Sequence, residues 1–181
     1  MKIILLFLLF IFSAFFVNAQ TQSSECVRGT PQPIVIRKIF PKTVFSLRKN
    51  KAYPFELTGF ETVNFKNGDK LVIENGGCEN FTLIFRFETG RFSGKPNDVK
   101  FWYQKAIQLM QEIQSGIDAP VAIRKGVKAL NSYLQKTLHP KFNQEIDFGG
   151  REIRDVTSLI GVKKLSQKNY KIELFFTTGP L

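Results

Sequence analysis

Few residues of this chain have the chemistry that a nucleophilic or metal-dependent enzyme needs. The sequence contains one histidine, His139, and two cysteines, Cys26 and Cys78. A histidine-activated nucleophile needs its base within hydrogen-bond reach, and a zinc site needs three or four nitrogen or sulfur ligands. The spacing of these three residues matches neither arrangement, and no phosphate-binding or dinucleotide-binding glycine motif is present. We therefore expect no metal and no cofactor, and we interpret His139 as a residue at the end of a helix.

Carboxylates leave one enzymatic route open. Glycoside cleavage needs only two Asp or Glu side chains at a suitable separation, which act as acid and as base or nucleophile. Two groups of acids are candidates, one beside predicted strands and one later in the chain: Glu74, Glu79, Glu88, Asp147, Glu152 and Asp155. Because the chain has 15 carboxylates, chance pairs are common. We therefore keep a carboxylate-dependent hydrolase of cell-envelope polymers as the alternative hypothesis.

The N-terminus has the pattern of a secretory signal peptide. Lys2 precedes an apolar run over residues 3–17, and Ala19 is the small residue that signal peptidase prefers. We predict a signal peptide over residues 1–19, cleavage between Ala19 and Gln20, and a secreted or periplasmic protein. No later segment is long and apolar enough to cross a bilayer, so we expect no transmembrane segment in the mature chain.

The two cysteines predict one disulfide. Cysteines pair in oxidising compartments, and a Cys26–Cys78 bond would close a loop of 78 − 26 = 52 residues. On the chain-entropy model such a loop constrains the unfolded state by roughly 4 kcal/mol. Because there is no Cys-x-x-Cys spacing, we interpret the pair as structural and as the link between the N-terminal arm and the sheet.

Positive charge is the strongest compositional signal. The formal net charge is +11, with 26 basic and 15 acidic residues. The segments 28–55 and 119–141 contain no acidic residue at all. A field of this kind attracts anionic partners and accelerates encounter with them. The alternative interpretation is a solvated basic surface without a ligand.

These observations lead to an exported, non-enzymatic binding protein with a basic surface as the first hypothesis. We expect its partner to be an anionic glycan, a lipid surface or an acidic protein. The residues predicted to bind it lie on a helix and on an N-terminal strand: Arg124, Lys125, Lys128, Lys136, Arg37 and Lys38.

Aromatic residues bear on two further hypotheses. A platform for single-stranded nucleic acid interleaves aromatic and basic residues, and Phe92 and Phe101 are the rings that strand or helix spacing does not assign to the core. Since spacing assigns most of the other rings to the core, we do not expect nucleic acid as a partner. A third hypothesis is an inhibitor or subunit that uses an exposed sheet edge.

Residues 60–88 carry the clearest strand signals. Asn67-Gly68 between two apolar runs predicts a tight hairpin turn. Phe81, Leu83, Phe85 and Phe87 alternate with polar residues, which indicates a strand with one apolar face. We expect a three-stranded meander.

Two amphipathic helices should follow. The first runs from about Asp98 to Ser115 with Asn97 as its cap, and Asp118 caps the second, whose first turn contains Pro120. The apolar positions of the second helix recur at helical spacing up to His139: Ile123, Val127, Leu130, Leu134 and Leu138. The short connection predicts an antiparallel helical hairpin against the sheet.

The remaining segments complete the predicted domain. We expect strands over 34–40, 44–47, 145–148 and 170–177. Residues 152–165 fit a helix or a strand, and the hairpin-like Ser166–Asn169 that follows favours a strand. The predicted organisation is a signal peptide (1–19), an extended arm (20–33) and one α+β domain (34–181). Its mostly antiparallel sheet should have the two helices packed on one face.

Overall fold

The computed structural model describes residues 28–49, 56–150 and 152–180. The predicted signal peptide, the cleavage site and Cys26 lie outside these residues. The signal peptide, the destination of the protein and the Cys26–Cys78 disulfide therefore stay predictions.

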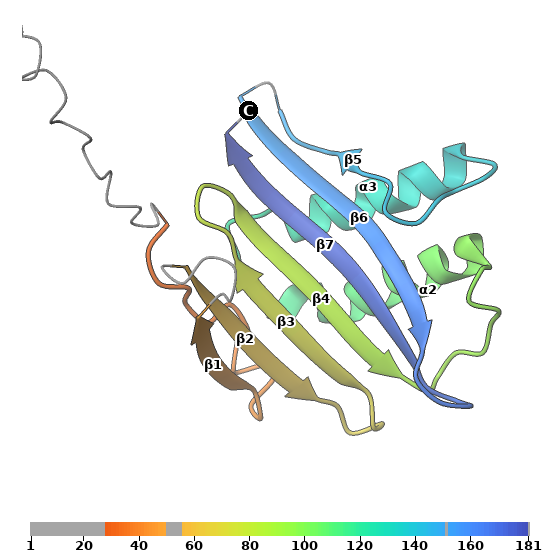
Figure 1. The fold of residues 1–181 in the computed structure, drawn as a ribbon, viewed down its shortest axis with the longest axis horizontal. Helices are drawn as coiled ribbons and strands as arrows, with labels where there is room; N and C mark the ends of the chain where they lie inside the picture. The colour runs from red at the N-terminus through yellow and green to blue at the C-terminus, as the bar shows by residue number, and fades with distance from the viewer. Residues whose placement is uncertain (1–27, 50–55, 151, 181) are drawn as a thin grey trace, which may run out of the picture.

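The described residues form a seven-stranded antiparallel sheet and two α-helices, so the α+β prediction is confirmed. The strands are β1 (Val44–Lys49), β2 (Leu57–Asn64), β3 (Lys70–Gly76), β4 (Phe81–Thr89), β5 (Ile146–Asp147), β6 (Ile153–Lys164) and β7 (Tyr170–Pro180). The helices are α2 (Val99–Ile113), a short 3-10 turn η2 (Gln114–Gly116) and α3 (Ile123–Lys136). The strand order is β1-β2-β3-β4-β7-β6-β5 (Figure 1), and the sheet forms the larger part of the molecule.

The meander and the C-terminal hairpin are confirmed as β2-β3-β4 and β6-β7. The tight turn at Asn67-Gly68 is confirmed: the Phe65 N–H donates to the Asp69 carbonyl at 2.9 Å, which leaves three residues between them. Gly68 ends this loop with φ +88°, the left-handed conformation that glycine tolerates.

The predicted strand over 34–40 is wrong. Val35 makes only an isolated bridge with Ile117, and residues 37–40 form a turn. The reason is a side chain: the buried Glu61 carboxylate accepts from the N–H groups of Ile34 (2.7 Å) and Val35 (3.0 Å). These backbone groups are thus satisfied without a strand partner.

The cap of the first helix and the start of the second differ from the prediction. Asp98, rather than Asn97, caps α2 by accepting from the Phe101 N–H at 3.1 Å. The second helix starts at Ile123 with Ala122 at its N-cap, and Asp118 lies outside the helix, where its N–H donates to Ile34 O at 2.8 Å.

The end of α3 also comes earlier than the apolar stripe predicts. The helix stops at Lys136, and Leu138 is 88 % exposed. Two tyrosines hold the loop that follows: Tyr103 Oη donates to Lys141 O at 3.0 Å, and Tyr133 Oη accepts from Lys141 N at 3.3 Å. The chain therefore leaves the helix before Leu138 can reach the core.

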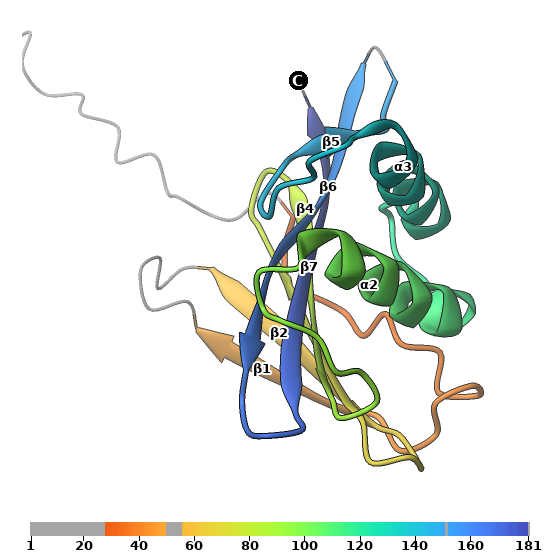
Figure 2. The ribbon, with the colours of Figure 1, turned by 90° about the vertical axis from the view of Figure 1, so that its right-hand side faces the viewer.

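The alternating apolar residues of the strands pack against the helices. We call this side of the sheet the covered face, and Figure 2 shows α2 and α3 next to each other beside it. Trp102 of α2 lies 4.7 Å from Tyr170, ring centroid to centroid, and Gly126 of α3 leaves room for the Phe176 ring. The largest buried side chains of this layer are fully enclosed: Trp102, Tyr103, Phe85, Phe87 and Phe176.

The opposite side of the sheet, which we call the open face, carries the other residues of the same strands. Arg86 on β4 binds Glu173 on β7 (2.9 Å) and Glu74 on β3. Thr82 and Thr177 share a hydrogen bond of 3.2 Å across β4 and β7. Figure 1 looks onto this face, with both helices behind the sheet.

Candidate anion-binding site

The basic residues predicted on the second helix all lie on the exposed surface of α3. Burial of Val127, Leu130 and Leu134 turns the opposite side of the helix outward. Arg124 and Lys128 are one turn apart on one side. The remaining pair, Lys125 and Lys136, shares a second side about three turns apart, so the four cations do not form one cluster.

A hollow of about 280 Å³ lies between the two helices and contains the first pair of cations. We call it the α2–α3 groove. Its lining consists of two cations, three amide side chains and one valine: Arg124, Lys128, Gln111, Gln114, Asn131 and Val127. No carboxylate belongs to it. Guanidinium, ammonium and amide groups are all hydrogen-bond donors, so the groove can hold a phosphate, sulfate or carboxylate group.

The electrostatics of α3 do not favour its own folding. The N-cap position is Ala122, which makes no side-chain capping bond, and the first turn has no acidic residue. Arg124 and Lys125 lie in this turn, at the positive end of the helix dipole. Lys136 in the last turn is favourable for the opposite reason. In the part of the chain that the structure describes, none of these cations has an ion-pair partner.

The predicted residues Arg37 and Lys38 lie on a turn rather than on a strand. Both side chains are exposed. The turn is anchored where the Ile36 N–H donates to Gly116 O at 2.9 Å, close in sequence to Gln114 of the groove. They flank the end of η2 and do not line the groove.

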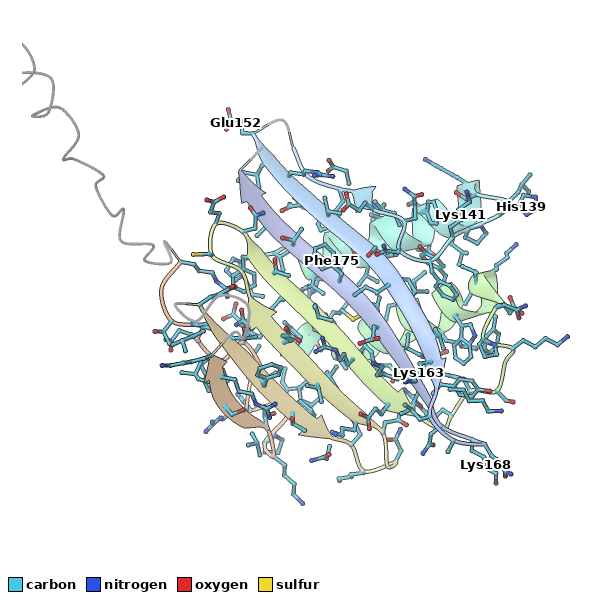
Figure 3. All side chains as sticks on the ribbon, in the orientation of Figure 1. His139, Lys141, Glu152, Lys163, Lys168 and Phe175 are labelled. Carbon is cyan, nitrogen blue, oxygen red and sulfur yellow. The ribbon has the colours of Figure 1, made fainter. Side chains whose placement is uncertain are left out.

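Three of the six candidate carboxylates come together elsewhere. Two adjoining hollows, of about 530 and 430 Å³, share Glu152 and Ile153 of the β6 strand region. Glu79 lines the larger hollow and Asp155 the smaller one. Figure 3 places Glu152 at the rim of the sheet, next to the start of β6.

The other three carboxylates have structural partners. Glu74 pairs with Arg86, Glu88 lies 3.8 Å from Lys70, and Asp147 accepts from the Gly149 N–H at 2.9 Å. Across residues 28–49, 56–150 and 152–180, no three His, Cys, Asp or Glu side chains are close enough to hold a metal ion.

His139 and the two unassigned aromatic rings do not extend a site. His139 is exposed in the loop after α3, on the same side of the molecule as Lys141 (Figure 3). The Lys105 ammonium lies 5.1 Å from the Phe92 ring centroid and 5.4 Å from that of Phe101. The protein's own cation thus occupies the rings that a nucleic-acid platform would use.

No family model matches this chain, and no curated protein and no solved structure is significantly similar to it. None of the described helices has the length and apolar character needed to cross a bilayer.

The sequence did not reveal the amide side chains of the groove. Gln111 is on α2 and Gln114 is three residues later at the start of η2, whereas Asn131 is on α3, one turn after Lys128. The i, i+4, i+7 spacing of Arg124, Lys128 and Asn131 was a usable signal for a polar stripe. The sequence held no usable signal for the glutamines that line the other side of the groove, because their position depends on how the helices pack.

Proposed function

We propose that this protein is an exported, non-enzymatic binding protein whose α2–α3 groove holds an anionic group of an envelope or extracellular partner. One observation carries the proposal. Two cations and three amides surround one hollow that contains no carboxylate, on a helix whose folding gains nothing from cations at that end. Arg124 and Lys125 oppose the helix dipole in the first turn, so their position is explained by a bound anion rather than by the folding of α3.

The basic side chains outside the groove indicate an extended partner. Lys125 and Lys136 lie along a second side of α3, and Arg37 and Lys38 flank the end of η2. A polymer with repeated sulfate, phosphate or carboxylate groups contacts several of them at once, whereas a single small anion reaches only the groove. The attraction is between exposed charges, so it weakens as the salt concentration rises.

The test is binding to three probes: a heparin oligosaccharide, phosphatidylglycerol vesicles and polyglutamate. The double variant Arg124→Glu/Lys128→Glu should weaken binding of the preferred probe by about tenfold or more, since it removes two charge-assisted contacts and adds repulsion. The matched control is Lys163→Glu/Lys168→Glu, which changes the charge equally at the far end of β6 and in the β6–β7 loop (Figure 3).

Two results would show the proposal to be wrong. One is that no probe binds the native protein at low salt, or that binding does not respond to salt. The other is that the control variant weakens binding as much as the groove variant does. The three probes also distinguish a glycan, a lipid surface and an acidic protein as the partner.

A carboxylate-dependent hydrolase is the second candidate, because Glu79, Glu152 and Asp155 line two adjoining hollows. If the protein cleaves an envelope polymer, Glu79→Gln and Glu152→Gln should each reduce the rate by at least about a hundredfold. If neither variant loses activity, or if the native protein cleaves no envelope polymer, this candidate is removed.

A further inference from the structure

The two edges of the sheet are built differently. On one edge, β5 has only two residues, β6 has a bulge between Leu159 and Gly161, and Arg154 pairs with Glu145 at 2.7 Å. Short strands, bulges and charges are devices that prevent another strand from pairing with a sheet. The β5 edge uses all three.

The β1 edge uses fewer of them. Its register with β2 is unbroken from Val44↔Thr62 to Lys49↔Leu57, without a bulge. Among the described residues, no strand pairs with its other side, and Figure 1 shows β1 as the last strand of the sheet. The strand therefore presents six residues of regular backbone to a partner.

On both faces of β1, the side chains change from apolar at the start of the strand to basic at its end. Val44, Ser46 and Arg48 point to the open face, whereas Phe45, Leu47 and Lys49 point to the covered face. Val44 is 64 % exposed and Leu47 is 43 % exposed, so apolar surface is accessible on each side of the strand. Each face thus begins apolar and ends with a cation.

We propose that β1 is a docking edge at which an extended acidic segment of a partner protein adds a further antiparallel strand. Charge complementarity selects this occupant, because no acidic residue occurs between Arg28 and Lys49. A second copy of β1 paired antiparallel would place its own Val44 and Phe45 opposite Lys49 and Arg48, so it offers these two cations no carboxylate. This edge is distinct from the α2–α3 groove and does not depend on it.

The gradient also specifies the order of residues in the partner. In an antiparallel pair the first residues of the added strand face Lys49 and Arg48, and the later residues face Leu47, Phe45 and Val44. The partner segment should therefore begin with two acidic residues and continue with apolar or β-branched ones. Main-chain hydrogen bonds provide affinity in this mode, and the side chains provide specificity.

The probe is the labelled peptide Glu-Glu-Val-Thr-Val-Val, with binding to the full chain measured by fluorescence anisotropy. Replacing its two glutamates by lysine should weaken binding by about tenfold or more. Two further peptides are N-methylated at alternate residues, in the two possible phases. One of them should bind about tenfold more weakly, because only one set of N–H groups faces β1.

Protein variants locate the binding edge. Arg48→Glu/Lys49→Glu should weaken binding of the acidic peptide by about tenfold and restore binding of the lysine peptide. The charge-matched control Lys163→Glu/Lys164→Glu on β6, and the groove variant Arg124→Glu/Lys128→Glu, should change it by less than about threefold. Circular dichroism checks that each variant is folded.

Three outcomes would overturn the inference. The first is that the acidic peptide does not bind, and the second is that both N-methylated peptides bind as well as the unmodified one. The third is that sedimentation shows a dimer that Leu47→Lys dissociates, which would make a second copy the occupant. None of these outcomes bears on anion binding in the groove, so the two proposals fail separately.

Discussion

The covered face and the open face are made by alternate residues of the same strands, yet they are stabilised in different ways. On the covered face, Phe85 and Phe176 are fully buried beneath the helices. On the open face, Arg86 lies between Glu74 and Glu173 and is about a quarter exposed. The apolar face needs a second layer to exclude water. The polar face satisfies its groups within its own plane and needs no such layer.

The open face nevertheless contains apolar residues. Ile84 is opposite Phe175 in the β4–β7 register, between the hydroxyl pair and the ion cluster. Both side chains are half-buried. The two apolar side chains pair across the strands beside the Arg86 cluster, and such cross-strand contacts stabilise a sheet.

The largest expected effect compares two phenylalanines. Phe85→Ala should lower the free energy of unfolding by about 3–5 kcal/mol, because it leaves a cavity in a fully buried position. Phe175→Ala makes the same chemical change on the half-buried open face and should lower it by about 1–2 kcal/mol. Urea denaturation of both variants gives the two values. Equal losses would show that the open face is as closely packed as the covered one.

A smaller effect concerns the carboxylate on the covered face. Glu61 is 1 % exposed, and burial raises its pKa, although its bonds from Ile34 N and Val35 N partly oppose this shift. Glu61→Gln should lower the free energy of unfolding by about 1–3 kcal/mol, because the amide nitrogen cannot accept from either N–H group. The control Glu88→Gln, at the margin of the open face, should change it by less than about 0.5 kcal/mol.

The same carboxylate gives a pH dependence. Because its pKa is higher in the folded chain than the unfolded value of about 4.3, the folded state holds this proton more tightly. Its contribution to stability is therefore full below that value and is lost as pH rises through the raised pKa. Urea denaturation between pH 4 and 7 should show this fall in the native protein and a flatter profile in Glu61→Gln. Identical profiles would contradict the assignment.

The smallest effect is expected for the ion cluster. Arg86→Met keeps the length of the side chain but leaves Glu74 and Glu173 without their shared cation. The free energy of unfolding should fall by about 1 kcal/mol. A double-mutant cycle with Glu173→Gln isolates the pair, and the coupling should decrease at high salt. A loss above about 3 kcal/mol would mean that the cluster holds the fold together as strongly as the core does.

Much of the fold was predictable because its signals are local. The alternation in 81–88 predicted β4, and the Ser166–Asn169 loop resolved the ambiguity of 152–165 in favour of β6. The errors occur where a distant group satisfies the backbone. Glu61 replaces a strand partner for Ile34 and Val35, and Asp118, which was expected to cap the second helix, is instead bonded through its N–H to Ile34 O.

The candidate site shows the same division. The sequence identified the cations of α3, because charge and helical spacing are read along one segment. It did not predict that Gln111 of α2 and Gln114 of η2 line the groove, or that Glu79 and Glu152 line the same hollow.

The sequence by itself determined the antiparallel α+β class, the apolar side of β4 and of the two helices, and the excess of positive charge. Only the tertiary structure decided which cations share a groove, which carboxylates meet, and which strand is left at the edge. The physical reason is the distance along the chain over which each property is decided. Side-chain periodicity and net charge depend on neighbours in the chain, whereas grooves, hollows and sheet edges depend on contacts between segments far apart in it.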